Sequence, residues 1–292
     1  MTSILTNTSA MSALQTLRNV NANLSQTQDR VSSGERVGQA SDNVAYWSIS
    51  TTMNSDNKAL NAASDALGVG AAKVDTAYAA MESAIDVVNE IKAKLTTASE
   101  TSVNKDQVNL EIEKLQQQLS AIGNAASFSG ENWTVQSTGS TTTVVDGFIR
   151  NSDGTVEITT AEFDSGTYAL FSSMTNGTGD GGILDEVMDI SISSASTQTN
   201  VDDFLNDVQS ALDELTDGAA ALGALKIRID LQDTYSSKLS DAITSGVSRL
   251  VDADMEEESA RLSALQTQQQ LAIQSLSIAN SSSQNLMTLF RG

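Results

Sequence analysis

The chain has 292 residues and a net charge of −21, and it contains no proline, cysteine or histidine. Without cysteine and histidine, it can form neither a disulfide nor a Cys/His zinc site, and it cannot use Ser–His or Cys–His catalysis. Its 16 Lys and Arg residues against 37 Asp and Glu residues argue against nucleic-acid binding, which needs clustered positive charge.

The absence of proline favours long uninterrupted helices, because proline removes a backbone donor and breaks helix interiors. Aromatic residues make up only 4% of the chain, which suits helices packed side by side better than one large globular core. No window approaches 18 apolar residues, so we expect no membrane span. The first residues lack a basic segment and a continuous apolar segment, so we expect no Sec signal peptide.

The first predicted helix is almost free of charge. Residues 1–28 carry only Arg18. A solvated helix normally places Glu and Lys on its outer face, so this helix is expected to be surrounded by protein. Its heptad is weak: Leu17, Leu24 and Val31 are seven apart, Leu14 precedes them at a d position, and Asn21 and Gln28 take the later d positions.

The next segment has a much stronger heptad repeat. Six a positions carry Leu60, Leu67, Val74, Met81, Val88 and Leu95, and the small or branched d partners are Ala63, Gly70, Ala77, Ala84, Ile91 and Ala98. A second seam follows at Val108, Ile112, Leu115, Leu119 and Ile122. We predict two helices with a turn around Ser99–Lys105.

The middle of the chain loses the heptads. From Phe128 to about Ser196, Gly, Thr, Ser and Asp become frequent. The short β-like runs are Trp133–Gln136, Thr142–Val145, Val156–Thr159 and Tyr168–Ser172, with turn signals between them. They predict a small antiparallel insertion, after which the glycine-rich stretch 176–182 leads back to helix near Leu184.

The second flank mirrors the first. One heptad register holds Val201, Val208, Leu215, Leu222, Ile229, Ser236, Ile243 and Leu250; Phe204, Ala211, Leu225 and Leu239 lie on the d side, and Gly218 and Gly246 are its weak points. Residues 262–290 then contain no charge, and their seam is Leu262, Leu265, Gln269, Ala272, Leu276, Ala279, Ser283, Leu286 and Phe290. We expect both chain ends to be marginal or disordered in an isolated copy and to fold on assembly.

An acidic cluster precedes the last segment, formed by Asp252, Asp254, Glu256, Glu257 and Glu258. Such a cluster could be a cation site or an assembly switch, but a solvated helix start or elbow is the favoured interpretation. The predicted fold is therefore mainly α: a long coiled-coil-like helical bundle formed by both chain ends, with a small β-rich central insertion.

The two ends carry a family resemblance. The run NTSAMSALQTLRNVNANLSQTQDRVSSGERVGQASDNVAYWSIS (residues 7–50) and the run DADMEEESARLSALQTQQQLAIQSLSIANSSSQNLMTLFRG (residues 252–292) resemble bacterial flagellin of the alphaproteobacterial, rhizobial-type branch. The likeness covers roughly residues 1–135 and 200–292. The residues in register with the family signature are Arg30, Ser33, Gly34, Arg36, Ala40 and Asp42.

The resemblance implies a division of the chain. Residues 1–42 and 252–292 would be the terminal-helix arms (D0), and residues 43–130 and 197–251 the helical rod (D1). Residues 131–196 would be the variable β-rich outer region, including the D1 hairpin. The expected assembly interface comprises Leu14, Leu17, Leu24, Val31, Leu262, Leu276, Leu286 and Phe290.

The resemblance also implies a function. It predicts a structural subunit of the flagellar filament, exported unfolded by the flagellar type III apparatus for swimming motility, and neither an enzyme nor a cofactor protein. The expected partners are further copies, possible sister flagellins, a filament cap protein, hook-associated proteins and an export chaperone. The expected location is extracellular.

Two departures from the family pattern concern host recognition. The segment Asp42–Tyr46 reads Asp-Asn-Val-Ala-Tyr where the family often has Asp-Asp-Ala-Ala-Gly. The position at which animal flagellin receptors look for arginine falls near Ile91. We therefore expect weak recognition by host flagellin receptors.

Two alternatives remain open, and a third is excluded by composition. A hook–filament junction protein shares both end arms and differs in copy number. A cytoplasmic coiled-coil signalling rod would need no uncharged ends. A flagellin with a zinc protease in its variable region would need His-Glu-x-x-His, which a chain without histidine cannot supply.

Overall fold

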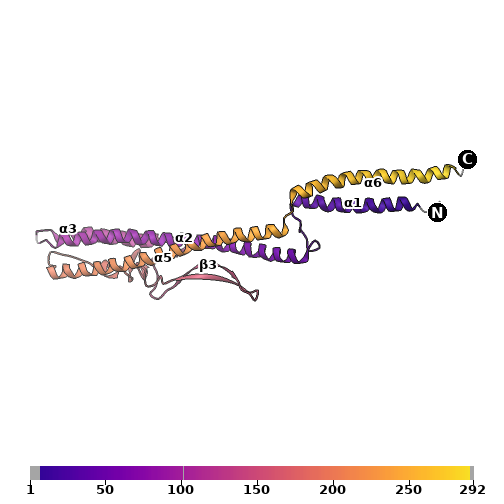
Figure 1. Ribbon diagram of the computed structural model, residues 1–292. Helices are drawn as coiled ribbons and strands as arrows, with labels where there is room; N and C mark the ends of the chain where they lie inside the picture. Colours follow the sequence, from indigo (N-terminus) through magenta and orange to yellow (C-terminus); the bar gives the residue numbers. More distant parts are fainter. Residues whose placement is uncertain (1–6, 101, 290–292) are drawn as a thin grey trace. The chain divides into compact units, whose positions relative to one another are not determined.

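The computed structural model describes residues 7–100 and 102–289, with side chains within this range up to Ser281. The predicted mainly α fold with a small β-rich centre is confirmed (Figure 1). The helices are α1 (Thr8–Ser33), α2 (Val44–Ala98), α3 (Lys105–Ala125), α4 (Asp185–Met188), α5 (Gln198–Val251) and α6 (Met255–Leu289). The strands are β1 (Ser127–Phe128), β2 (Glu131–Asn132), β3 (Thr142–Arg150), β4 (Val156–Phe163), β5 (Ser173–Thr175) and β6 (Thr178–Asp180).

The chain divides into two compact units. The terminal unit consists of Met1–Asn57 and Asp241–Gly292, and the central unit of Lys58–Ser240. Both chain ends therefore contribute to one unit, while α3, α4 and all the strands belong to the other. The division into five D0, D1 and outer segments remains a prediction.

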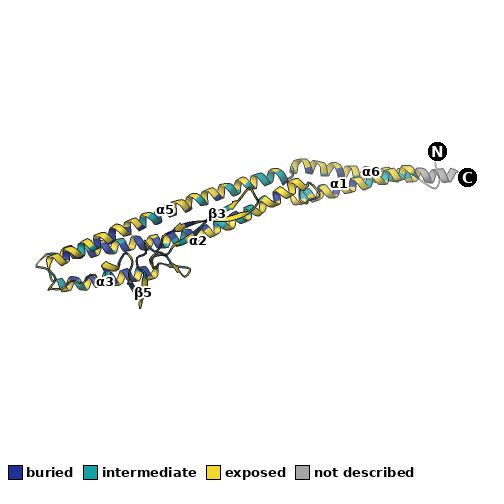
Figure 2. Ribbon diagram, turned by 90° about the horizontal axis from the view of Figure 1, so that it is seen from below, coloured by how far each residue is buried: buried dark blue, intermediate teal, exposed yellow. Residues whose placement is uncertain are grey.

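The heptad seams form the core of the central unit. All six predicted a residues of α2 are at most 3% exposed. The a residues of α5 from Val201 to Ile229 and Ser236 are also buried, and Val108, Ile112 and Leu119 add the buried face of α3. Figure 2 shows this buried face in dark blue along α2, α3 and α5. The predicted coiled-coil-like register is confirmed here.

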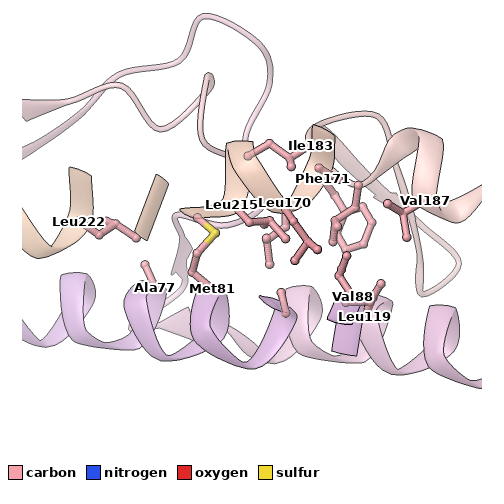
Figure 3. Packing of buried hydrophobic residues seen from close by; sticks show 14 of the residues in the cluster. Ala77, Met81, Val88, Leu119, Leu170, Phe171, Ile183, Val187, Leu215 and Leu222 are labelled. Atoms are coloured by element: carbon pink, nitrogen blue, oxygen red, sulfur yellow. The ribbon is translucent and has the colours of Figure 1, made fainter. Parts of the chain in front are cut away.

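Phe171 fills the centre of this core. It is fully buried, and Figure 3 shows its ring beside Val88, Leu119 and Val187. A Cβ atom on Gly179 would lie 2.2 Å from the Phe171 ring, so only glycine allows this approach. The aromatic ring therefore links the strand region to the helical seam.

The predicted helix boundaries around the first turn are confirmed. Helix α2 ends at Ala98 and α3 begins at Lys105, where the Asn104 Oδ1 atom accepts hydrogen bonds from the N–H groups of Asp106 (3.1 Å) and Gln107 (3.4 Å). The helix expected near Leu184 is the single turn α4. Its carbonyl groups accept hydrogen bonds from the buried Gln116 amide, at 2.9 Å for Val187 and 3.1 Å for Met188.

The strands form three antiparallel hairpins, β1–β2, β3–β4 and β5–β6. The predicted runs 142–145 and 156–159 are confirmed as parts of β3 and β4, whose pairing is interrupted by a bulge between Val145 and Gly147.

The runs Trp133–Gln136 and Tyr168–Ser172 were wrong as strands. They meet through only one bridge, the parallel pair Val135 and Phe171. For the first run the reason is local: the Asn132 Oδ1 atom accepts hydrogen bonds from the N–H groups of Thr134 (2.9 Å) and Val135 (3.2 Å), which curls the chain into a turn.

Candidate assembly surface

Helices α1 and α6 of the terminal unit lie side by side and run in opposite directions (Figure 1). Little is buried between them: the buried apolar cluster is Val20, Leu24 and Leu265, with half-buried Leu262 packed against it. The pair also lines an open groove of 680 Å³, whose walls are mostly small residues such as Thr8, Ser12 and Ala13. The pair of helices α1 and α6 is thus held together by a narrow apolar strip.

The predicted seam of α6 is confirmed as far as side chains are described. Leu265 and Ala272 are buried, and Leu262, Gln269, Leu276 and Ala279 are half-buried at the expected spacing. The backbone of Leu286 lies within α6, but its side chain is outside the described residues, as is that of Ser283. Phe290 lies wholly outside them.

The α1 seam needs one correction. Leu17, Leu24 and Val31 lie on the buried side as predicted, but Asn21 and Gln28 are exposed, and Val20 and Thr27 take the second position. In a heptad, the residues three and four positions after an a residue both border the seam. The apolar Val20 therefore takes the buried position, and the amide of Asn21 stays at the surface. Asn21 instead accepts a hydrogen bond at the rim from the Gln269 Nε2 atom, at 2.8 Å.

Several large apolar residues of the pair remain on the surface. Met11 is 64% exposed, and Leu271, Ile273 and Ile278 are 58%, 53% and 69% exposed. Leu14, also off the seam, is 37% exposed. Sequence reasoning missed the first four because it followed the heptad. The available signal was the presence of apolar residues outside the heptad positions in segments that carry almost no charge.

The signature residues build a joint where the end of α1 meets the link between α5 and α6. Gly34 ends α1 with φ 75°, a left-handed conformation that favours glycine, and its N–H donates to the Arg30 carbonyl at 2.8 Å. The chain then pairs with the α5–α6 link: the Arg36 N–H donates to the Val251 carbonyl at 2.6 Å, and the Ala253 N–H to the Gly34 carbonyl at 2.9 Å.

The remaining signature residues hold this loop in shape. The Arg36 guanidinium donates to the Leu250 carbonyl at 3.1 Å. Ser33 Oγ accepts from the Glu35 N–H, also at 3.1 Å. The carboxylate of Asp42 accepts from two backbone N–H groups, those of Gly38 and Gln39, and Ala40 is half-buried.

The acidic cluster begins a helix, as the favoured interpretation predicted. Asp254 Oδ1 accepts from the N–H groups of Glu256 (3.0 Å) and Glu257 (3.2 Å) at the start of α6. Acidic side chains are favourable there because the helix dipole is positive at this end. No group of metal-ligating side chains occurs in residues 7–100 and 102–289.

One carboxylate of the cluster is buried. The Glu258 side chain is 6% exposed, and its Oε1 atom pairs with Arg30 of α1 at 3.2 Å and with Arg261 at 3.1 Å. The Arg30–Glu258 pair therefore links the last turn of α1 to the first turn of α6.

Comparison with known proteins decides the family. Sequence profiles described as the bacterial flagellin N-terminal helical region and C-terminal helical region match residues 4–138 and 205–290. Flagellin C and flagellin A of Rhizobium meliloti strain 1021 are 47% and 42% identical to the chain, and a flagellin of Brucella melitensis biotype 1 is 45% identical. Each comparison covers 100% of both sequences. The chain belongs to the bacterial flagellin family.

Membership of the flagellin family confirms the resemblance found in the sequence and shows that the chain is a structural protein. Flagellins are structural proteins that self-assemble into the extracellular flagellar filament, so this chain is a filament subunit, and the hook-associated alternative is not favoured. No helix within the described ranges has the length and hydropathy that a membrane crossing requires.

Replacing Glu258 with Gln removes the charge shared by the two arginines. Breaking a buried ion pair on one side is destabilising, here by about 2–3 kcal/mol because both guanidinium groups are partly exposed. We expect faster amide hydrogen exchange in α1 of assembled filaments. The matched control is Glu256→Gln, at an exposed position of the same helical turn, which should leave exchange unchanged. Equal exchange in both variants would contradict a tie at this joint.

Proposed function

We propose that filament assembly depends on the terminal helix pair α1 and α6. The observation that carries this proposal is the exposed set Met11, Leu271, Ile273 and Ile278. These residues lie in the segments 1–28 and 262–290, whose only charged side chain is Arg18. Burial of apolar surface contributes about 25 cal/mol per Å², against which the ordering entropy must be set. Copies of the same pair offer such burial.

The predicted interface residues then divide into two roles. Leu17, Leu24, Val31, Leu262 and Leu276 lie on the seam, so they act by holding α1 and α6 together. Leu14 lies on the surface with the exposed set and would contact neighbouring copies. Leu286 and Phe290 remain proposed interface residues.

Family membership supports a proposal for the rest of the assembly pathway. We propose export in an unfolded state through the flagellar type III apparatus, with an export chaperone, and polymerisation beneath a cap protein. Hook-associated proteins and sister flagellins would be the neighbours in the filament. In this scheme residues 1–42 and 252–292 form D0, residues 43–130 and 197–251 form D1, and residues 131–196 face outward.

The narrow seam predicts that the arms gain order from assembly. In the isolated chain, the amides of residues 1–35 should exchange rapidly, because few side chains of α1 are buried. In filaments, the same amides should be protected. Strong protection of this segment in the isolated chain would contradict folding on assembly.

Replacing Leu271 and Ile278 together with Asp tests the exposed set. Both residues lie off the seam, so the α1–α6 pair should survive, but charges would be buried between copies. We expect the concentration needed for seeded polymerisation to rise more than tenfold, measured at raised salt so that the net charge is screened. The control Leu271→Met with Ile278→Met keeps the surface apolar and should polymerise. Normal filaments from the Asp variant would refute the assignment.

Host receptors should respond weakly to this flagellin. Ile91 is fully buried in the central core, so its side chain is not presented to a partner, and the segment after Asp42 departs from the family pattern. Purified monomer should activate plant and animal flagellin receptors far less than a flagellin that carries the family pattern at both positions, in a dose–response reporter assay. Comparable potency would overturn this expectation.

A further inference from the structure

Helix α5 carries a second apolar seam on its outer face. Ile227 and Leu231 are 63% and 67% exposed, and Ala224 and Ala220 continue the row one and two turns earlier. The spacing is four, three, four, which is that of a coiled-coil seam. At about 100° per residue, Ile227 lies about 200° around the helix from the buried Ile229, so this row points away from the core. We call these four residues the ridge.

The central unit also has an apolar groove. It lies between α2 and the β3–β4 hairpin, has a volume of 660 Å³, and contains only Glu157 as a charged lining residue. Its floor is alanine at positions 59, 62, 63 and 66 of α2, so it lacks bulky side chains. Its opposite wall is made of Val145, Phe148, Val156 and Ile158 of the hairpin.

The hairpin is anchored, so the groove is a fixed feature. At one end of the hairpin, Val144 packs so closely on α2 that a Cβ atom on Gly70 would lie 2.1 Å from it. On the other side, Asp146 of β3 pairs with Arg228 of α5 at 2.6 Å. These two contacts hold one end of the hairpin against the helices. The other end, with Val156 and Ile158 of β4, forms the rim of the groove.

Ridge and groove lie at a similar level along the central unit. Ser64 Oγ of α2 donates to Asp233 of α5 at 2.8 Å, which places the groove floor near the turn that follows Leu231. The two features are different surfaces of one unit. A contact to which one copy contributes only its ridge and the other only its groove is heterologous, and it leaves a free ridge and a free groove for the next copies.

We propose that the ridge of one copy packs into the groove of a neighbouring copy in the filament. The branched side chains of Ile227 and Leu231 fit a groove floored by alanine, in the manner of knobs entering holes. Charge agrees: Lys238, one heptad after Leu231, has no ion pair within the described residues, and Glu157 is exposed at the groove. In a chain of net charge −21, this contact brings opposite charges together. The inference rests on the proposed assembly and assigns it a second contact.

A disulfide test suits this chain because it has no cysteine of its own. Two full-length variants, Leu231→Cys and Ala62→Cys, are mixed in equal amounts, polymerised from seeds and oxidised with copper–phenanthroline in air. Two thiols then lose two protons and two electrons to the oxidant and form one disulfide. We expect covalent dimers on a non-reducing gel from the mixed filaments. Filaments of either variant alone should give none, because the contact is heterologous.

The control replaces the groove partner Ala62 with an apolar residue that is also exposed but lies on another helix. Leu110 of α3 is 59% exposed, and mixed Leu231→Cys and Leu110→Cys filaments should remain monomeric on the gel. As a second measurement, Ile227→Glu with Leu231→Glu should raise the critical concentration at least tenfold, without changing the thermal unfolding of the isolated chain.

The outcomes separate the two proposals. If filaments form but the 231–62 pair gives no dimers and the Glu variant polymerises normally, the ridge–groove contact is wrong and assembly through the arms stands. Dimers of equal yield from the Leu110 control would also overturn it. Impaired polymerisation of the Glu variant while Leu271→Asp with Ile278→Asp polymerises normally would instead refute the role of the arms.

Discussion

The structure depends on close packing along uninterrupted heptad seams. In the central unit, the a positions of α2 are large and its d positions, apart from Ile91, are small. This asymmetry brings neighbouring elements into contact with the helix backbone. Gly70 lies directly beneath Val144 of the hairpin, and Gly218 of α5 accommodates Met81. Such packing requires helices without breaks over many turns, which the absence of proline permits.

Seam packing is much less extensive in the terminal unit, and this difference bears on assembly. The central seam is continuous and deeply buried, whereas α1 and α6 share a strip interrupted by Thr27, Gln269 and small residues. A helix pair of this kind gains little from its own partner. Its remaining apolar surface is most stable when covered by other copies, so intrinsic stability and capacity for assembly are set by the same residues.

The sequence predicted the packing correctly where the heptad repeat of large apolar residues is regular, and less well where it is weak. Where large apolar residues recur every seven positions, as from Leu60 to Leu95, one register buries far more apolar surface than any other, so the pattern determines the packing. In α1, Val20 and Asn21 compete for one position, and the outcome depends on which partner residues α6 presents. The turn at Asn132 depends on a side-chain hydrogen bond that competes with strand pairing and has no periodic signature.

The joint could be located but not explained from sequence. The cluster of signature residues and the acidic run marked both sides of it, yet only the fold brings Gly34 beside Ala253 and Arg30 beside Glu258. These residues are about 220 positions apart along the chain, and no local pattern encodes their pairing. The exposed Met11, Leu271 and Ile278 were missed for a related reason: amphipathic analysis identifies the buried face and treats the rest as solvated.

Segments whose charges repel other copies and segments that can contact other copies occupy different parts of the chain. Residues 151–225 contain fourteen Asp and Glu residues and no Lys or Arg, whereas residues 262–290 contain no charge. Packing many copies concentrates the acidic segments, which opposes assembly at low ionic strength and keeps separate polymers apart. The segments 1–28 and 262–290, which carry only Arg18, avoid this repulsion where copies must touch. On the central unit, where repulsion is strongest, a contact between copies needs a surface with little negative charge, and the ridge on α5, followed by Lys238, meets that requirement.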